Sequence, residues 1–273
     1  MHELYQVKKV KMELYHDHFQ NYKRYNIPKA QLVIADIPYN LGNNAYASSN
    51  QWYVGGDNKN GESDKANKSF FKTDENFNLA EYMHFCGKLL KKEPKEKNQA
   101  PAMIVFCSFE QMPIVIDYGK KHGFAKNYPI FFIKNYSSQV LKANMKIVGA
   151  TEHAVVLYRD KLPKFRNGKT DEVKGKMIFN WFEWKRDNAN DYPKIHPTQK
   201  PVNIIKRLIS IFTDEGDIVI DPCAGSGATL RAAYELGRSS YGFEIEKKFY
   251  NDAKEKMLDV DNINKSNQLE LII

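Results

Sequence analysis

Short apolar runs, each followed by an acidic residue, recur along the chain. In an open α/β sheet, parallel strands bring their carboxyl ends to one edge, and ligands bind at that edge. Carboxylates that follow several strands therefore predict a polar ligand there. The runs and the acids after them are 11–16 with Asp17, 32–35 with Asp36, 218–220 with Asp221, and 240–243 with Glu244.

Further runs rich in β-branched and aromatic residues predict strands at 102–107, 130–133 and 154–158. Between the strands, apolar residues recur at helical spacing over 79–90 and again over 204–212, which predicts two core-facing helices. Strands that alternate with helices are typical of α/β proteins. The pattern therefore predicts a doubly wound, mostly parallel sheet of about seven strands.

Two long stretches interrupt this alternation. Residues 40–78 are rich in Asn, Gly, Ser and Lys without periodicity, and because they begin just after Asp36 we expect a functional loop. Residues 136–195 combine aromatic and basic side chains, with ten Lys or Arg against five Asp or Glu between 161 and 200. This predicts an insert that faces nucleic acid. The alternative is a solvated loop with a small core around its tryptophans.

The composition is typical of a globular protein, and its excess of basic residues favours binding to a polyanion. The 273 residues include 42% hydrophobic residues, and 41 Lys or Arg against 33 Asp or Glu give a net charge of +8. A solvated Lys-rich surface would explain this charge equally well. No apolar run is long enough to span a membrane, and the first ten residues lack the apolar core of a secretory signal, so the default expectation is a cytoplasmic protein.

Cysteine and histidine spacing predicts no metal site. Cys86, Cys107 and Cys223 are widely separated and form no Cys-x-x-Cys pair, so we expect reduced thiols rather than zinc ligands or disulfides. His16 and His18 stand at alternating positions, which leaves a metal-binding pair as an alternative.

Residues 218–230 combine a strand, Asp221, a Gly-x-Gly turn and a helix. Glycine lets backbone amides and a helix N-terminus come close to a ligand. Glu244 follows Asp221 by 23 residues, the interval at which a carboxylate captures ribose hydroxyls. Leu230 stands where a dinucleotide-binding loop carries its third glycine, which argues against a nicotinamide cofactor.

Two of these segments carry a family resemblance. Asp36-Ile37-Pro38-Tyr39 resembles the Asp-Pro-Pro-Tyr signature of S-adenosylmethionine-dependent enzymes that methylate an exocyclic amino group of a DNA base, and 221–227 resembles their cofactor loop. Residues 196–201 look like the start of the helix that precedes that loop. The order of tetrapeptide, basic insert and cofactor loop is similar to the β class of DNA amino-methyltransferases. The resemblance covers about 11–256 of this chain.

The resemblance implies a target base and a mechanism. Asp in the first place of the tetrapeptide resembles the adenine-N6 members, whereas cytosine-N4 members usually carry Ser, and Ile37 departs from the usual Pro. An adenine amino nitrogen is a poor nucleophile because its lone pair is delocalised into the ring, so it needs hydrogen-bond acceptors. Asp36 and the Ile37 carbonyl are the implied acceptors. Tyr39 would stack on a base that has swung out of the duplex, with loop 40–78 closing over it.

The implied site residues fall into three groups. The catalytic group comprises Asp36, Ile37, Pro38 and Tyr39. The cofactor-binding group comprises Asp17, Asp36, Thr198, Gln199, Lys200, Asp221, Cys223, Ala224, Gly225, Ser226, Gly227 and Glu244. The DNA-binding group comprises Lys164, Arg166, Lys185 and Arg186.

The resemblance also implies a domain organisation and a set of partners. We expect a catalytic half at 1–135, a target-recognition insert at 136–195 and a cofactor-binding half at 196–273. The expected cofactor is S-adenosylmethionine and the expected partner is DNA, with no metal and no membrane. Dimers are common in the resembling family, which leaves both a monomer and a homodimer open, since no interface can be identified from the sequence. The alternatives are cytosine-N4 methylation, another amine such as one in RNA, a non-catalytic DNA-binding protein, and a distant nicotinamide oxidoreductase.

Overall fold

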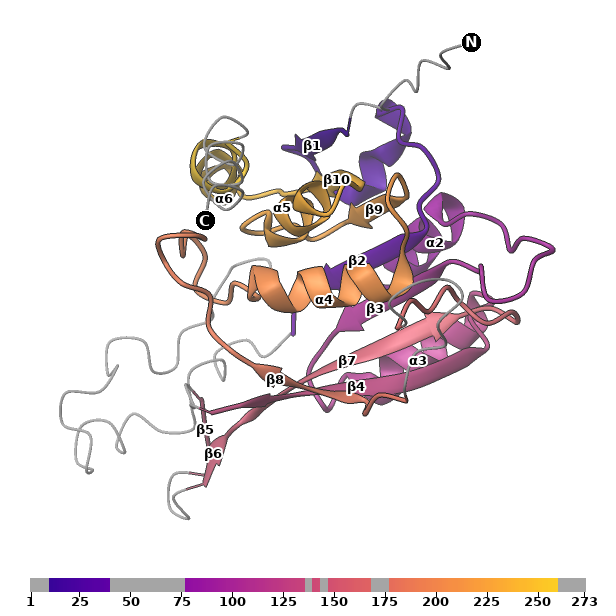
Figure 1. The fold of residues 1–273 in the computed structure, drawn as a ribbon, viewed down its shortest axis with the longest axis horizontal. Helices are drawn as coiled ribbons and strands as arrows, with labels where there is room; N and C mark the ends of the chain where they lie inside the picture. Colours follow the sequence, from indigo (N-terminus) through magenta and orange to yellow (C-terminus); the bar gives the residue numbers. More distant parts are fainter. Residues whose placement is uncertain (1–9, 40–76, 136–138, 143–146, 168–176, 260–273) are drawn as a thin grey trace, which may run out of the picture.

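An eight-stranded mixed sheet forms the centre of the molecule (Figure 1). The computed structural model describes residues 10–39, 77–135, 139–142, 147–167 and 177–259. In sheet order the strands are β1 (Met12–Tyr15), β10 (Ser239–Phe243), β9 (Ile218–Asp221), β2 (Leu32–Asp36), β3 (Ala102–Phe106), β7 (Thr151–Tyr158), β4 (Lys126–Lys134) and β8 (Trp181–Trp184).

Strand direction decides which residues share an edge. The strands from β1 to β3 are all parallel, β7 runs antiparallel to both β3 and β4, and β8 is parallel to β4. The first residues of β7 therefore lie at the same edge as the last residues of β2 and β3. A separate two-stranded sheet pairs β5 (Gln139–Lys142) with β6 (Ile147–Gly149).

Helices cover both faces of the sheet, and the alternation within each strand explains why. In β2, Leu32 and Ile34 pack with α4 and α5, whereas Val33 and Ala35 pack with α2 and α3 on the other face. Figure 1 shows these two layers. The helices and helical turns are η1 (Phe19–Arg24), α2 (Leu79–Leu89), α3 (Met112–Lys121), α4 (Val202–Phe212), α5 (Ala228–Glu235), α6 (Lys247–Asp252) and the π-turn η6 (Ala253–Met257).

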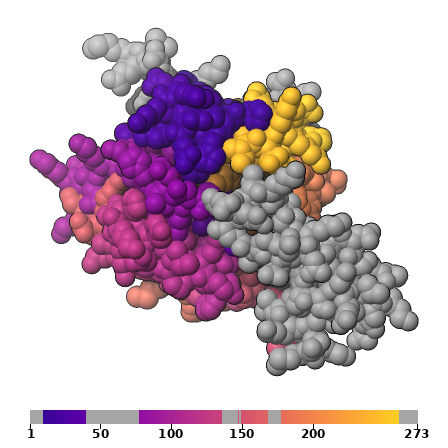
Figure 2. Space-filling model, turned by 180° about the vertical axis from the view of Figure 1, so that it is seen from behind, coloured from indigo at the N-terminus to yellow at the C-terminus, as the bar shows by residue number. Residues whose placement is uncertain are grey.

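The two ends of the described chain meet beside β1. Leu14 of β1 shares a small core with Ala253 and Leu230, and the ring of His16 lies 5.1 Å from that of Tyr250. Figure 2 shows the indigo N-terminal part next to the yellow C-terminal helices. The C-terminal segment therefore packs on the sheet beside the cofactor-loop strands.

The predicted fold class is confirmed, with differences in detail. The main sheet has eight strands rather than about seven, because β8 was not foreseen. Both predicted helices form, and Asn78 caps α2 by accepting a hydrogen bond from the Glu81 amide at 3.1 Å. Trp184 of β8 is buried in the main core, whereas Trp181 is exposed, so the tryptophans form no satellite core of their own.

Candidate active site

The acidic residues that the sequence placed after strands gather at one edge of the sheet. Asp36 ends β2, Asp221 ends the neighbouring strand β9, and Glu244 directly follows β10. The Glu244 amide donates to the Tyr15 carbonyl at 3.0 Å, which ties the end of β10 to the end of β1. The predicted tetrapeptide and the predicted cofactor loop are therefore neighbours across the β2–β9 pair.

Asp36 lies in an ion-pair network with Lys200. The Lys200 ammonium is 2.6 Å from Asp36 Oδ2 and 3.8 Å from Glu152 Oε2. Lys200 reaches this point because it stands just before α4, whose first residues lie at the same edge of the sheet. Asp36 Oδ1 is buried and accepts no hydrogen bond from the part of the chain that the structure describes.

Glu152 and Lys134 complete this network, and neither was predicted. Glu152 Oε1 accepts from Lys134 Nζ at 2.5 Å, and Glu152 Oε2 accepts from the Tyr39 hydroxyl at 3.0 Å. Glu152 stands at the start of β7 rather than at a strand end. Because β7 is antiparallel, its beginning meets the ends of the parallel strands, and no local sequence pattern reveals that direction.

Burial and charge act against each other within the network. Burial raises the pKa of the Asp36 carboxyl, although the Lys200 ammonium opposes the rise. Burial disfavours a charged Lys200, yet Asp36 and Glu152 outweigh it and raise the pKa of the ammonium. Burial also acts on Glu152, but Lys200 and Lys134 lower the pKa of its carboxyl. Asp36 is therefore the more readily protonated of the two carboxyl groups.

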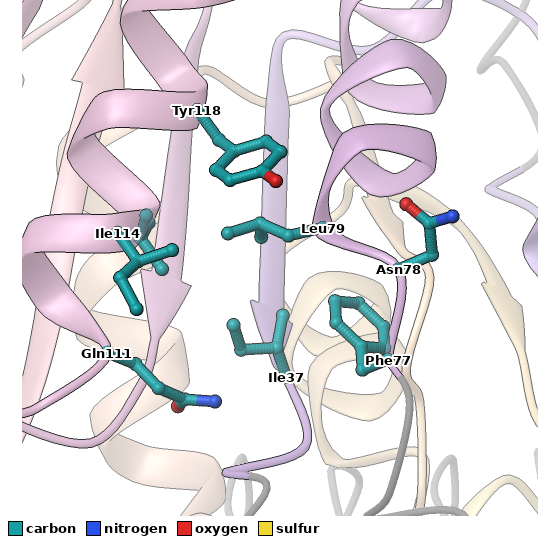
Figure 3. Close-up of a pocket in the computed structure, with 8 residues that line it drawn as sticks. Ile37, Phe77, Asn78, Leu79, Gln111, Ile114 and Tyr118 are labelled. Atoms are coloured by element: carbon teal, nitrogen blue, oxygen red, sulfur yellow. The ribbon is translucent and has the colours of Figure 1, made fainter.

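The tetrapeptide is held from the β3 side. The Ile37 amide donates to the Phe106 carbonyl at 3.2 Å, and Gln111 Nε2 donates to the Pro38 carbonyl at 2.9 Å. A cavity of about 280 Å³ lies between α2 and α3, beside Ile37 (Figure 3). The Ile37 side chain points into it and Gln111 lines it, so the cavity lies on the face opposite to α4 and Lys200.

The glycine loop takes the tight conformation that its sequence predicted. Gly225 and Gly227 have φ values of 51° and 78°, which residues with a Cβ adopt only at a cost. The Ala224 amide donates to the Phe243 carbonyl at 2.9 Å, and the Cys223 amide donates to Asp221 Oδ1 at 3.0 Å. This loop leads directly into α5, so it presents a helix N-terminus at the edge where Asp36 lies.

Two carboxyl groups beside the glycine loop have pKa values well above the usual range for Asp and Glu. Burial raises the pKa of Asp221 and that of Glu244 to about 7 each. Hydrogen bonds from the Thr229 side chain and the Cys223 amide to Asp221, and from the Glu246 amide to Glu244, oppose these rises. Neither carboxyl has an ion-pair partner among the described residues. A ligand that donates hydrogen bonds there would stabilise the ionised form.

The segment before α4 supplies one network residue and several loop contacts. Gln199 accepts from the Ile195 amide at 3.2 Å and donates to the Pro193 carbonyl at 3.1 Å, while the amide and hydroxyl of Thr198 lie 3.3 and 3.1 Å from His196 Nδ1. The His196 ring faces Gly225, and burial lowers the pKa of that ring to about 4. Thr198 and Gln199 therefore shape the loop, and Lys200 alone of the three contacts Asp36.

Asp17 lies at the predicted edge but is engaged within its own segment. Its oxygens accept from the His18 amide at 2.7 Å, from Asn21 Nδ2 at 2.6 Å and from the Tyr25 hydroxyl at 2.9 Å. His18 Nδ1 accepts from the Gln20 amide, whereas His16 Nε2 lies near the Ile245 carbonyl, so the two histidines serve separate partners.

The four predicted DNA-binding residues are divided between two edges. Lys185 and Arg186 follow β8, are exposed, and lie at the edge where Asp36 is. Lys164 pairs with Asp217 at 2.6 Å and with Asp214 at 2.7 Å, and Arg166 pairs with Asp214. Asp217 directly precedes β9, so these pairs lie at the amino-terminal end of the parallel strands, opposite to the end that holds Asp36. Their placement argues against the predicted DNA contact of Lys164 and Arg166.

Other features of the described residues concern metals, thiols and membranes. These residues contain no group of three His, Cys, Asp or Glu side chains arranged to hold a metal ion. Cys86 and Cys107 are buried, Cys223 is partly buried, and all three are free thiols. No described helix has both the length and the apolar character needed to cross a membrane.

The predicted loop at 40–78 falls almost wholly outside the described residues.

Comparison with known proteins identifies the family. Residues 30–255 match the N6_N4_Mtase family, described as DNA methylase. The chain is 28% identical over 253 residues to the DNA adenine methyltransferase YhdJ of Escherichia coli strain K12, a match that spans 83% of this chain and 76% of YhdJ.

Two solved structures share the fold. The M1.HpyAVI–SAM complex has a TM-score of 0.60 at 23% identity, covering 89% of this chain and 98% of the other. The cytosine-N4-specific PvuII DNA methyltransferase has a TM-score of 0.59 at 14% identity, covering 90% of this chain and 88% of the other. The match to the family extends from β2 through the glycine loop to α6, and this chain belongs to the N6/N4 family of DNA methyltransferases.

Proposed function

We propose that this protein methylates the exocyclic N6 amino group of an adenine that has been extruded from DNA, with S-adenosylmethionine as the methyl donor. The observation that carries the proposal is Asp36 Oδ1, a buried acceptor without a partner among the described residues, in the first place of the tetrapeptide. An unsatisfied buried acceptor costs about 1–3 kcal/mol and is a natural position for a donor supplied by a substrate. An amino group is such a donor.

The residues of the glycine loop fit the cofactor. Gly225 and Gly227 take positive φ values that residues with a Cβ adopt only at a cost, and the loop that they shape ends at the N-terminus of α5. Glu244 stands at the end of the next strand, where its carboxylate can accept hydrogen bonds from ribose hydroxyls. Asp221, which ends the strand before this loop, suits the ammonium of the methionine part. When bound, S-adenosylmethionine supplies a methyl group carried on a positively charged sulfur.

Asp36 serves the amine before and after transfer. A hydrogen bond from the amino group to Asp36 Oδ1 draws the nitrogen lone pair out of the ring and makes it available for attack. As the nitrogen becomes positively charged, the nearby carboxylate stabilises that charge. Burial raises the pKa of Asp36, so its carboxylate can also accept the proton that the methylated amine must lose. Tyr39, whose hydroxyl is held by Glu152, presents an aromatic ring for base stacking.

A second candidate function is cytosine-N4 methylation. It is favoured by the shared fold of the PvuII enzyme, whose name gives that specificity. The acidic first residue of the tetrapeptide and the relative named as an adenine methyltransferase favour adenine. Lys185 and Arg186 remain the proposed DNA contacts, since both are exposed at the edge that holds Asp36.

One experiment tests both candidates. DNA from cells that express the wild-type protein or the Asp36→Ala variant would be digested to nucleosides and analysed by mass spectrometry. We expect N6-methyladenine in the wild-type sample alone. N4-methylcytosine would replace the first candidate by the second, and equal methylation by the variant would refute the role of Asp36.

A further inference from the structure

One ammonium stands between two carboxylates at the centre of the site. Lys200 Nζ lies 2.6 Å from Asp36 Oδ2 and 3.8 Å from Glu152 Oε2, and its side chain is only 10% exposed. A small rotation of the lysine side chain would carry the ammonium from one acid to the other. Both positions keep its positive charge paired, which a buried charge requires.

The position on Asp36 conflicts with methyl transfer to an amine. While Lys200 is bound to Asp36, it neutralises the negative charge that the target amine needs in its acceptor. It also places a second cation beside a nitrogen that becomes positive during the reaction, and like charges repel strongly where water is excluded. The pair is therefore suited to the protein without a bound base, and the ammonium must withdraw when the amine arrives.

Glu152 is placed to receive it. Glu152 Oε1 is held by Lys134 at 2.5 Å, and Oε2 accepts from the Tyr39 hydroxyl at 3.0 Å while facing Lys200. A carboxylate oxygen can accept a second hydrogen bond, so Oε2 can take the ammonium without releasing Tyr39. Lys200 is flanked by the rings of Tyr39 at 5.3 Å and Phe106 at 5.6 Å, which favour a cation in this position.

We propose that Glu152 is a positioning residue that takes Lys200 from Asp36 Oδ2 when the target amine enters, so that Asp36 carries an unneutralised negative charge while its Oδ1 accepts the hydrogen bond of the amine. This inference rests on the proposed function but requires only that the target be an amino group, whether of adenine or of cytosine. Since Tyr39 and Lys200 then share one oxygen of Glu152, the arrival of the base also steadies the ring on which it stacks.

The test uses the full chain and the rate of a single turnover on DNA. Glu152→Gln keeps an acceptor for the Tyr39 hydroxyl but removes the charge that attracts Lys200. We expect it to lower the rate of methyl transfer by about ten- to a hundredfold, a range typical of coupled neighbours, with cofactor affinity within about twofold of the wild-type value. Transfer is counted on every base, so target choice does not affect the result.

Three further variants separate positioning from folding. In Lys200→Met protein no ammonium competes for Asp36, so adding Glu152→Gln should change the rate by less than about threefold. The double variant Glu152→Gln, Lys134→Met is charge-balanced and still lacks the negative charge that attracts Lys200, so it should remain as slow as Glu152→Gln alone. Circular dichroism and cofactor binding by calorimetry report whether each variant is folded.

The outcomes are distinct. The inference is overturned if the Glu152→Gln protein transfers methyl groups at the wild-type rate. It is equally overturned if Glu152→Gln lowers the rate by the same factor in the presence and in the absence of Lys200. It is also overturned if both Glu152 variants fail to fold or to bind cofactor, because Glu152 is then a purely structural residue. If the wild-type protein transfers no methyl group to any base of DNA, the proposed function itself fails, and the inference with it.

Discussion

Lys200 forms an ion pair with Asp36 at 2.6 Å, although 164 positions separate them along the chain. The pair joins the end of β2 to the entrance of α4 across the face of the sheet. Because a buried charge is costly without its partner, changing either residue affects both. Variants of this site must therefore be compared with controls for folding and for cofactor binding.

Asp36→Asn should abolish most methyl transfer while leaving cofactor binding nearly unchanged. The amide keeps the size of the side chain but cannot stabilise a positive charge on the amine, and losing one such interaction typically lowers kcat by about 10²–10³-fold. Incorporation of labelled methyl groups into DNA measures the first effect, and calorimetric titration with S-adenosylmethionine measures the second. Turnover at the wild-type rate would remove Asp36 from the catalytic assignment.

Cofactor affinity should increase with pH. The pKa values of Asp221 and Glu244 are about 7, and hydrogen bonds donated by a bound cofactor favour their ionised forms. Binding should therefore tighten between about pH 6 and pH 8 and release protons, which calorimetry in buffers of different ionisation enthalpy detects. Glu244→Gln should weaken binding and reduce both the pH dependence and the proton release. A wild-type affinity that does not vary with pH would contradict this assignment.

In the cofactor-free protein, the contribution of Glu244 to folding stability should decrease as the pH rises. Its pKa is raised in the folded state, so its contribution to stability is full below about pH 4.5 and is lost as pH rises through about 7. Glu244→Gln removes this cost of ionisation. We expect the variant to be more stable than the wild type at about pH 8, by about 1–3 kcal/mol, and the difference to vanish near pH 4. Denaturant unfolding at both pH values measures it.

Gly242→Ala should destabilise the protein markedly. A Cβ at Gly242 would lie 2.7 Å from a Leu230 methyl carbon and 3.1 Å from the Ala224 Cβ, in a fully packed region below the glycine loop. Overpacking of this kind costs about 1–3 kcal/mol. Gly87→Ala is the matched control, because it lies within α2 with no atom within 4 Å of the added carbon and should stabilise the helix by about 0.5–1 kcal/mol. Thermal unfolding distinguishes the two, and equal effects would refute the steric argument.

Substitution of Lys164 should affect folding stability, whereas substitution of Lys185 should affect DNA binding. Lys164→Met leaves Asp217, which is 8% exposed, without one of its partners, so we expect a loss of about 1–3 kcal/mol at neutral pH and little change in DNA affinity. Burial of Asp217 is outweighed by Lys164 and Lys91, which lower the pKa of its carboxyl. That stabilisation is present above the usual Asp range near pH 4 and is lost in acid, where the variant should approach the wild type.

Lys185→Ala should instead weaken DNA binding without affecting stability, because its side chain is 73% exposed. If Lys185 contacts a phosphate, the slope of log affinity against log salt should fall by about one. Fluorescence anisotropy over a range of salt concentrations measures this slope. An unchanged slope for Lys185→Ala, or a reduced slope for Lys164→Met, would reverse the assignment of the two edges.

Local features of the site can be predicted from short stretches of the sequence. An apolar run followed by an acid identifies a strand end, and a Gly-x-Gly turn before an apolar helix identifies a tight loop between a strand and a helix. These signals depend on neighbouring residues, so they need no knowledge of the fold. They correctly placed Asp36, Asp221 and Glu244 at one edge of an α/β sheet.

Which side chains come into contact at that edge depends on how the distant parts of the chain pack together. Glu152 joins the site because β7 runs antiparallel to β3, Lys200 turns to Asp36 because α4 packs across the sheet, and Lys164 lies at the far edge beside Asp217. Strand direction and strand order depend on how all the layers pack together. The residue type gives the charge of a side chain, but the distance between that charge and its partner depends on the packing of the whole chain.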